Sequence, residues 1–313
     1  MRILVTGAAG FIGSQLSLRL LQEGHHVVGL DNLVSGSRAN LRPLEENPGF
    51  DFWEADLTAG LGDEGQFEQI YNCACPASPK DFDGRGLEIM QVCSVGTWNL
   101  LELSRRCGAR FLQTSTSECY GDPEVHPQPE TYWGNVNPIG PRSVYDEGKR
   151  FAEAMITAYS RRYGTETRIA RIFNTYGPGM RIDDGRVLPN FIPQALAGKP
   201  ITVYGDGGQT RSFCYITDQI AGLRAVMNGD FSGPINIGNP VEVTMLQLAK
   251  EIIELTGSSS QIEFKPLPAD DPKVRCPDIS RAKEKLGWTP KVDRREGLTK
   301  TIDYFRQRLE IEN

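Results

Sequence analysis

The chain has 313 residues, 39% apolar and 24% charged, a composition that supports one large packed domain or two unequal ones. Its 34 basic and 40 acidic residues give a net charge of −6, and no Lys/Arg run stands out, so we expect no nucleic-acid partner. No apolar stretch approaches the roughly 18 residues that a membrane span needs. The chain also starts directly with a predicted strand, without a charged-then-apolar leader, so we expect a cytoplasmic protein with no membrane partner.

Short apolar runs alternate with helical patterns through residues 1–174, as in a parallel sheet covered by helices. We predict a Rossmann-like, doubly wound α/β domain there. A smaller C-terminal α/β lobe over residues 175–313 is expected to bind substrate and to return some segments to the main sheet. The strands are predicted at Arg2–Thr6, Val27–Leu30, Phe50–Trp53, Gln69–Tyr71, Arg110–Leu112 and Arg168–Phe173, and the helices at Phe11–Gln22, Leu87–Arg106, Ser143–Tyr163, Leu188–Ala197, Asp218–Met227, Thr244–Leu255 and Glu296–Leu309.

The first predicted strand runs into a glycine turn that opens a helix, as a dinucleotide site requires. The free N–H groups of that helix N-terminus favour a phosphate. Asp31 ends the second strand, where a carboxylate would hold ribose hydroxyls and repel a 2′-phosphate, so we predict NAD rather than NADP. An empty glycine turn and an ordinary strand-end aspartate are the alternatives. The predicted cofactor residues are Gly7, Gly10, Phe11, Ile12, Gly13, Asp31, Asn32, Asp56, Leu57, Ala74, Ser115, Tyr145 and Lys149.

Tyr145 and Lys149 are four residues apart and share one face of a predicted helix. A neighbouring ammonium favours the phenolate, so we expect Lys149 to lower the pKa of Tyr145. The phenolate would then take the proton of a sugar hydroxyl while hydride leaves for nicotinamide. A solvated helix face is the alternative explanation of this spacing.

Seven cysteines occur, an odd number whose spacings match no zinc pattern. Two of them, Cys73 and Cys75, suggest a metal or redox site, but on a strand their side chains would point to opposite faces. We expect reduced, packed thiols and no metal. The cysteines are Cys73, Cys75, Cys93, Cys107, Cys119, Cys214 and Cys276.

Several stretches together resemble the extended short-chain dehydrogenase/reductases of the nucleotide-sugar epimerase and dehydratase family, over essentially the whole chain. Within that family the chain is most similar to the UDP-glucuronate decarboxylases. The stretches that carry the resemblance are the glycine turn, Ser115-Thr116-Ser117-Glu118, Tyr120-Gly121-Asp122-Pro123, residues 132–140, Tyr145-Asp146-Glu147-Gly148-Lys149-Arg150, Phe173-Asn174-Thr175-Tyr176-Gly177-Pro178 and Gln209-Thr210-Arg211.

The resemblance implies that UDP-glucuronate is oxidised at C4 with NAD, loses CO₂ from the 4-keto intermediate, and is reduced again to UDP-xylose. Tyr145 would be the acid/base at O4, supported by Lys149, and Thr116 would hydrogen-bond the reacting oxygen. Ser117 and Glu118 would act near C5 and the carboxylate. The 4,6-dehydratases of the family carry Asp-Glu at these two positions, so Ser117 argues against dehydration.

Arg275 matches an arginine of the decarboxylases and would orient the carboxylate or assist protonation at C5. Its alternative is a surface arginine that pairs with Asp270, Asp271 or Asp278. Further residues would bind the UDP-sugar. For two of them another explanation is equally open: Arg186 would be a solvated loop arginine, and Tyr204 would only pack against its neighbours. These predicted substrate residues are Asn174, Arg186, Tyr204, Gln209, Arg211 and Arg275.

Some positions depart from the family pattern, and we expect them to lie on the side of the pocket that faces substrate: Asn72, Cys73, Cys75, Phe82, Gln91 and Cys93. These departures leave the identity of the nucleotide-sugar substrate undetermined. A 4-epimerase or 4,6-dehydratase is therefore one alternative, and a non-catalytic NAD(H)-binding sensor is another. The resemblance also implies a homodimer through a four-helix contact made by Leu87–Arg106 and Ser143–Tyr163.

Overall fold

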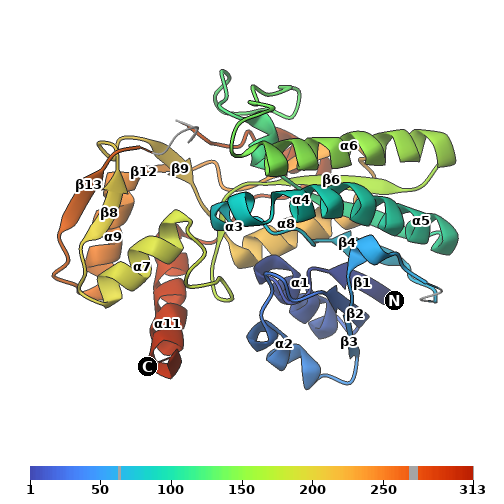
Figure 1. Ribbon diagram of the computed structural model, residues 1–313, viewed down its shortest axis with the longest axis horizontal. Helices are drawn as coiled ribbons and strands as arrows, with labels where there is room; N and C mark the ends of the chain where they lie inside the picture. The colour runs from blue at the N-terminus through green and yellow to red at the C-terminus, as the bar shows by residue number, and fades with distance from the viewer. Residues whose placement is uncertain (63–64, 268–273, 313) are drawn as a thin grey trace.

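A seven-stranded parallel sheet runs through the molecule, and a smaller group of helices and short strands packs beside it (Figure 1). The computed structural model describes residues 1–62, 65–267 and 274–312. Within these ranges the strand order is β11-β6-β5-β4-β1-β2-β3, and every neighbouring pair is parallel. The strands are β1 Arg2–Thr6, β2 His26–Asp31, β3 Phe50–Glu54, β4 Gln69–Asn72, β5 Arg110–Thr116, β6 Thr167–Ile172 and β11 Pro234–Ile237.

Helices cover both faces of this sheet because its strands alternate apolar side chains between two buried layers. Ile3 packs with Leu16 on one face, whereas its neighbour Leu4 packs with Leu100 and Ile156 on the other. The first face carries α1 Phe11–Gln22, α2 Arg38–Glu45 and α8 Ile216–Asn228, and the second carries α5 Thr97–Cys107 and α6 Ser143–Tyr163 (Figure 1).

The smaller lobe is built from short strand pairs and helices. β8 Ile201–Tyr204 pairs with β13 Ile262–Lys265, β9 Thr210–Ser212 with β12 Glu242–Thr244, and β7 Thr175–Tyr176 with β10 Cys214–Tyr215. The lobe also contains α7 Val187–Leu196, α9 Met245–Thr256 and α11 Arg294–Glu312, while α10 Ser280–Leu286 contacts β11. Strand β11 lies beside β6 in the main sheet. A domain division after residue 174 stays a prediction.

The predicted α/β fold is confirmed, and α1 and α6 have the predicted bounds. A single regular helix over Leu87–Arg106 is wrong. The segment consists of α4 Gly86–Gln91, a π-helical stretch at Val92–Gly96 and α5, because its hydrogen bonds shift register in the middle. Across the described ranges, no helix combines the length and the apolar content that crossing a bilayer requires.

The strand order reverses between β1 and β4, and in open α/β sheets ligands bind at such a point, beyond the carboxyl ends of the strands. Three short helices follow strand ends on this side of the sheet. They are η1 Leu57–Ala59, α3 Pro79–Gly84 and η3 Ser117–Tyr120.

Candidate active site

A cavity of about 640 Å³ lies between the carboxyl ends of β5 and β6 and the smaller lobe. It brings together every residue predicted to be catalytic or to bind substrate, although these come from segments far apart in the sequence. The lining includes Thr116, Ser117, Glu118, Tyr145, Lys149, Asn174, Arg186, Tyr204, Gln209, Arg211 and Arg275. Their roles stay predictions, but their convergence on one cavity is a property of the fold.

A second cavity, of about 140 Å³, lies at the carboxyl ends of β1 and β2. Most of the predicted cofactor residues line one of these two cavities, with Ile12, Ser115, Tyr145 and Lys149 on the larger. Phe11 and Gly13 line neither of them. The predicted cofactor residues on the smaller cavity are Gly7, Gly10, Asp31, Asn32, Asp56, Leu57 and Ala74.

The glycine turn forms a cradle that side chains would fill. Gly7 has a φ of +67°, and a Cβ there would lie 2.7 Å from the Cys73 carbonyl oxygen. A Cβ on Gly13 would lie 2.1 Å from the Gly7 carbonyl oxygen, so this helix position must be glycine for the turn to keep its shape. The geometry fits a pyrophosphate at the N-terminus of α1.

Asp31 lies at the rim of the smaller cavity. Its carboxylate accepts backbone N–H bonds from Ala9 at 3.0 Å and from Leu33 at 2.8 Å. Burial raises the pKa of Asp31, and these two hydrogen bonds act in the opposite direction. A carboxylate held here suits ribose hydroxyls and disfavours a 2′-phosphate, so the site fits NAD.

Tyr145 is buried on α6 and stacks on Phe82, with ring centroids 5.3 Å apart. Burial raises the pKa of Tyr145 to about 12, although the Lys149 ammonium lowers it. Lys149 thus acts on the pKa of Tyr145 in the expected direction, but in the ligand-free chain the loss of hydration outweighs this charge. The Lys149 ammonium donates to the Thr114 carbonyl oxygen at 2.9 Å and lies 5.8 Å from the Tyr145 ring centroid.

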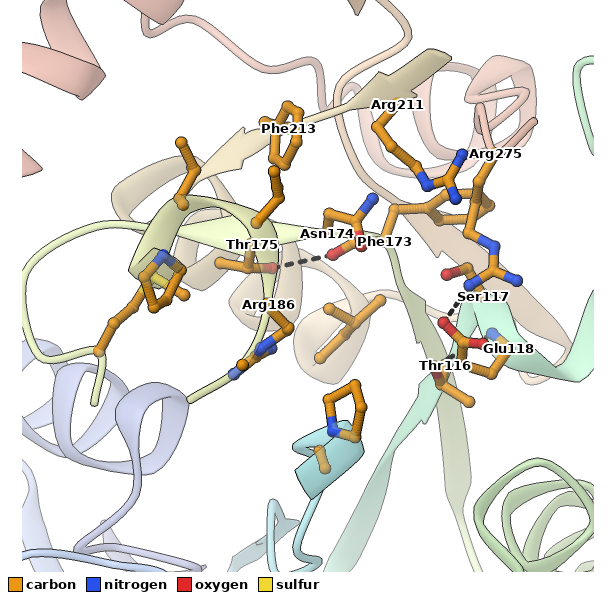
Figure 2. A pocket seen from close by; sticks show the side chains of 18 of the residues that line it. Thr116, Ser117, Glu118, Phe173, Asn174, Thr175, Arg186, Arg211, Phe213 and Arg275 are labelled. Atoms are coloured by element: carbon orange, nitrogen blue, oxygen red, sulfur yellow. Dashed lines mark hydrogen bonds and ion pairs between the residues drawn. The ribbon is translucent and has the colours of Figure 1, made fainter. Parts of the chain in front are cut away.

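Glu118 is held between two arginines. Its carboxylate accepts from Arg275, and from Arg142 at 2.6 Å (Figure 2 shows Arg275 directed at Glu118). Burial raises the pKa of Glu118, but the two guanidinium groups outweigh it and hold the value at about 2. Glu118 is therefore a carboxylate at neutral pH. Arg142 lines the same cavity, and no spacing in the sequence singles it out.

The alternative that Arg275 is a surface arginine is wrong, because the residue is only 3% exposed. It pairs with Glu118 and donates to the Gly121 carbonyl oxygen at 3.1 Å. Asp278 instead accepts from the Ser280 backbone N–H, and Asp270 and Asp271 lie outside the described residues. The buried Arg275 Nε has no hydrogen-bond partner within the described part of the chain.

Cations gather on the part of the cavity formed by the smaller lobe. Arg186 lines the cavity from the loop before α7 and donates to the Asp184 carboxylate at 2.7 Å. Arg211 lines the cavity from β9, and Lys265, which sequence reasoning missed, lines it from β13 (Figure 2 places Arg211 and Arg186 among the lining side chains). This surplus of positive charge suits a diphosphate.

The expectation that the unusual positions face substrate is only partly correct. Cys73, Cys75 and Phe82 line the larger cavity, whereas Gln91 lines the smaller one. Asn72 is buried and accepts from the Thr6 hydroxyl at 2.8 Å, and Cys93 lies behind the cavity wall. Cys73 and Cys75 also follow β4 rather than lying on it, so the argument from alternating strand faces does not apply to them.

Comparisons with known proteins agree with this geometry. Residues 3–238 match the model of the NAD dependent epimerase/dehydratase family. UDP-glucuronic acid decarboxylase 1 of Arabidopsis thaliana is 53% identical over 309 residues, covering 99% of this chain and 71% of that protein.

Two solved structures share the fold over nearly the whole chain. The UDP-glucose 4-epimerase of Thermotoga maritima, with UDP-glucose, has a TM-score of 0.90 at 31% identity and covers 99% of this chain and 100% of its own. The UDP-glucuronic acid 4-epimerase of Bacillus cereus, in complex with UDP-glucuronic acid and NAD, has a TM-score of 0.87 at 31% identity, with coverage of 98% and 99%.

Proposed function

Because the chain belongs to the NAD-dependent epimerase/dehydratase family, we propose that it converts UDP-glucuronate to UDP-xylose and CO₂. The observation that carries the proposal is the buried Glu118–Arg275 pair in the same cavity as Tyr145 and Thr116. A carboxylated sugar needs a fixed cation beside its carboxylate, and an alcohol oxidation needs a base beside its hydroxyl. Relatives that are 53% identical across the chain carry the name of this activity.

NAD would be held by the glycine turn and Asp31, and it would supply the hydride acceptor and donor for C4. Tyr145 takes the proton of the C4 hydroxyl, and the Thr116 hydroxyl, whose hydrogen bond lowers the pKa of Tyr145, orients the same oxygen. Lys149 stabilises the phenolate. Its ammonium is buried beside the ring and is fixed by the Thr114 carbonyl.

Arg275 orients the C6 carboxylate through its guanidinium and is placed to assist protonation at C5 after CO₂ leaves. The negative charge that then develops on the C4 oxygen faces the Tyr145 and Thr116 hydroxyls. Glu118 fixes Arg275 and Arg142 in place, and its low pKa keeps it ionised throughout the neutral range. Ser117 adds a small hydroxyl next to this pair. The diphosphate lies against Arg186 and Arg211, where the cations of the smaller lobe gather.

The runner-up is a 4-epimerase or a 4,6-dehydratase. A dehydratase must protonate a departing hydroxyl, and an acid whose pKa is about 2 does this poorly, so the state of Glu118 favours decarboxylation. An epimerase that acts on a neutral sugar would have no carboxylate for the buried Arg275 to orient. A non-catalytic sensor would have no use for Tyr145 and Lys149, which converge on the cavity together with Thr116.

The direct test is NMR of the purified protein with UDP-glucuronate and NAD. The proposal expects UDP-xylose signals to replace those of the substrate. A UDP-sugar that keeps its C6 carboxylate but has an inverted C4 would establish the epimerase instead. Unchanged sugar in the presence of tightly bound NAD would favour the sensor.

A homodimer is part of the proposal. Apolar side chains stand exposed along α4, α5 and α6, a face that two copies would cover by packing as four helices. Leu87 is 76% exposed and Trp98 is 46% exposed, while Phe151 on α6 is 52% exposed. A cytoplasmic location is also proposed, and it is supported by seven free cysteines, which suit a reducing compartment.

A further inference from the structure

Two cysteines that the proposed reaction does not use touch each other beside the cofactor side of the cavity. The sulfur atoms of Cys75 and Cys93 are 3.7 Å apart, although the residues come from different segments. Cys75 follows β4 and lines both cavities, whereas Cys93 lies in the π-helical stretch and is 3% exposed. Both positions depart from the family pattern, and the fold places them in contact.

The surroundings favour a thiolate at this pair. The hydrogen bond between the two sulfurs lowers the pKa of Cys93 and raises that of Cys75, so the charge rests mainly on Cys93. Burial raises the pKa of both thiols, and the Lys149 ammonium lowers the pKa of both. By contrast, burial alone dominates at Cys73, where it raises the thiol pKa to about 12. The pair therefore gives up its first proton more readily than its buried neighbour, and the remaining proton is shared between the two sulfurs.

We propose that Cys75 and Cys93 form a peroxide-sensitive site, in which an intramolecular disulfide reversibly lowers the activity of the enzyme. Cys75 is the sulfur that a small peroxide reaches through the cavity, and Cys93 is the resolving thiol behind it. The ligand class is a hydroperoxide, and hydrogen peroxide is the simplest member.

The chemistry balances with no other reactant. The proton of Cys75 first passes to the Cys93 thiolate across the 3.7 Å contact. The Cys75 thiolate formed in this way attacks one peroxide oxygen, the O–O bond breaks, and the departing hydroxide takes up the proton that the pair had released. Cys93 then attacks the sulfenic sulfur, the S–O bond breaks, and a second water leaves as the S–S bond forms. Two thiols and one hydrogen peroxide thus give one disulfide and two waters.

A disulfide would alter the active site because each of the two sulfurs belongs to a segment that lies beside it. Closing the sulfur–sulfur distance from 3.7 Å to about 2.05 Å draws the π-helical stretch and the segment after β4 together. That segment lines both cavities. Cys93 also abuts α6 at Gly148, where an added Cβ would lie 3.3 Å from the Cys93 Cβ, and Gly148 directly precedes Lys149. We expect turnover to fall on the order of tenfold or more, because small displacements of reacting groups are costly.

The test treats the 313-residue protein with hydrogen peroxide, alkylates the remaining thiols and analyses the peptides without reduction. The expected product is a cross-linked pair containing Cys75 and Cys93, which dithiothreitol reverses. Cys75→Ser and Cys93→Ser should each abolish it, while Cys107→Ser, which changes a thiol at the far end of α5, should retain it. Only sulfinic or sulfonic acid at these positions, or no reaction at peroxide levels that oxidise Cys107, would overturn the proposal.

The activity readout rests on the proposed function and is separable from the cross-link. Oxidised protein should regain UDP-glucuronate turnover after dithiothreitol, and the Cys107→Ser protein should lose and regain it in parallel. A cross-linked protein with undiminished turnover would refute the regulatory effect. If the reduced protein turns over no UDP-glucuronate, the proposed function fails, whereas the cross-link still decides whether the thiol site exists.

Discussion

Glu118 is the residue whose state most sharply constrains the chemistry. Two guanidinium groups outweigh its burial and lower its pKa to about 2, so it is poorly suited to donate a proton near neutral pH. Its role is to hold Arg275 and Arg142 at the edge of the cavity, where a carboxylated sugar needs positive charge. The distinction between decarboxylation and dehydration therefore depends on a charge state rather than on residue identity alone.

Replacing Arg275 should separate the oxidation from the loss of CO₂. In Arg275→Ala, Tyr145 and Thr116 are unchanged, so bound NAD should still oxidise C4 and NADH absorbance should appear on adding UDP-glucuronate. Release of CO₂ should slow on the order of 10²-fold, because the carboxylate is no longer held in the orientation from which CO₂ leaves. Stopped-flow absorbance with parallel CO₂ detection measures both steps. Arg275→Lys is the matched control, and its rate of CO₂ release should lie between those of the wild type and of Arg275→Ala. Wild-type kinetics in the alanine variant would contradict the role assigned to Arg275.

The Glu118 carboxylate also predicts how stability depends on pH. Its folded pKa of about 2 lies below the unfolded value of about 4.3, so the ionised group stabilises the fold above that unfolded pKa. This contribution, on the order of 3 kcal/mol, is lost as the pH falls from about 4.3 to about 2. Denaturant unfolding of Glu118→Gln should give a flatter pH dependence across that window. Parallel curves for the two proteins would show that Glu118 is not held as described.

At the scale of elements, the glycine turn before α1 is the part of the site most tightly limited by space. Gly13→Ala places a Cβ 2.1 Å from a backbone oxygen, which no side-chain movement relieves. We expect NAD affinity to fall at least on the order of 10²-fold, measured by isothermal titration calorimetry, despite the helix propensity that alanine adds. Gly84→Ala, at an exposed helix end with no atom within 4 Å of the new Cβ, is the matched control. Unchanged affinity in Gly13→Ala would remove the turn from the cofactor site.

The elements differ in how far the sequence could predict them. α1 and α6 were predictable because long amphipathic patterns set their bounds, and the catalytic spacing lies on one of them. The π-helical stretch at Val92–Gly96 was not, since a shift of hydrogen-bond register leaves the apolar periodicity nearly unchanged. α2 was missed because it is short, polar and contains Pro43. The contact of Arg142 with Glu118 depends on loop geometry that no local pattern encodes.

At the scale of the whole molecule, the exposed apolar face of α4, α5 and α6 predicts the assembly. The 34.7 kDa chain should elute with about twice that mass in light scattering behind size exclusion, as a C₂ dimer does. Leu87→Arg should give monomers, because it buries a charge in the proposed interface. Ile139→Arg changes an apolar residue that is even more exposed but lies outside these helices, and it should leave the dimer intact. A monomeric wild-type protein would refute the interface.

The large cavity gathers its lining from both halves of the chain, with Thr116 and Tyr145 beside the main sheet and Arg211 and Arg275 from the later residues. The residues for oxidation and those for carboxylate binding therefore come together only when the whole chain has folded. This arrangement suits a reaction in which one sugar is oxidised, decarboxylated and reduced without leaving the site.

The most direct test follows the fate of C6 in UDP-glucuronate labelled there with carbon-13, with the purified protein and a catalytic amount of NAD. Labelled CO₂ should appear in step with UDP-xylose and with no net NADH, while Tyr145→Phe should bind NAD and give neither product. Turnover that leaves the label in a UDP-sugar would contradict the central claim.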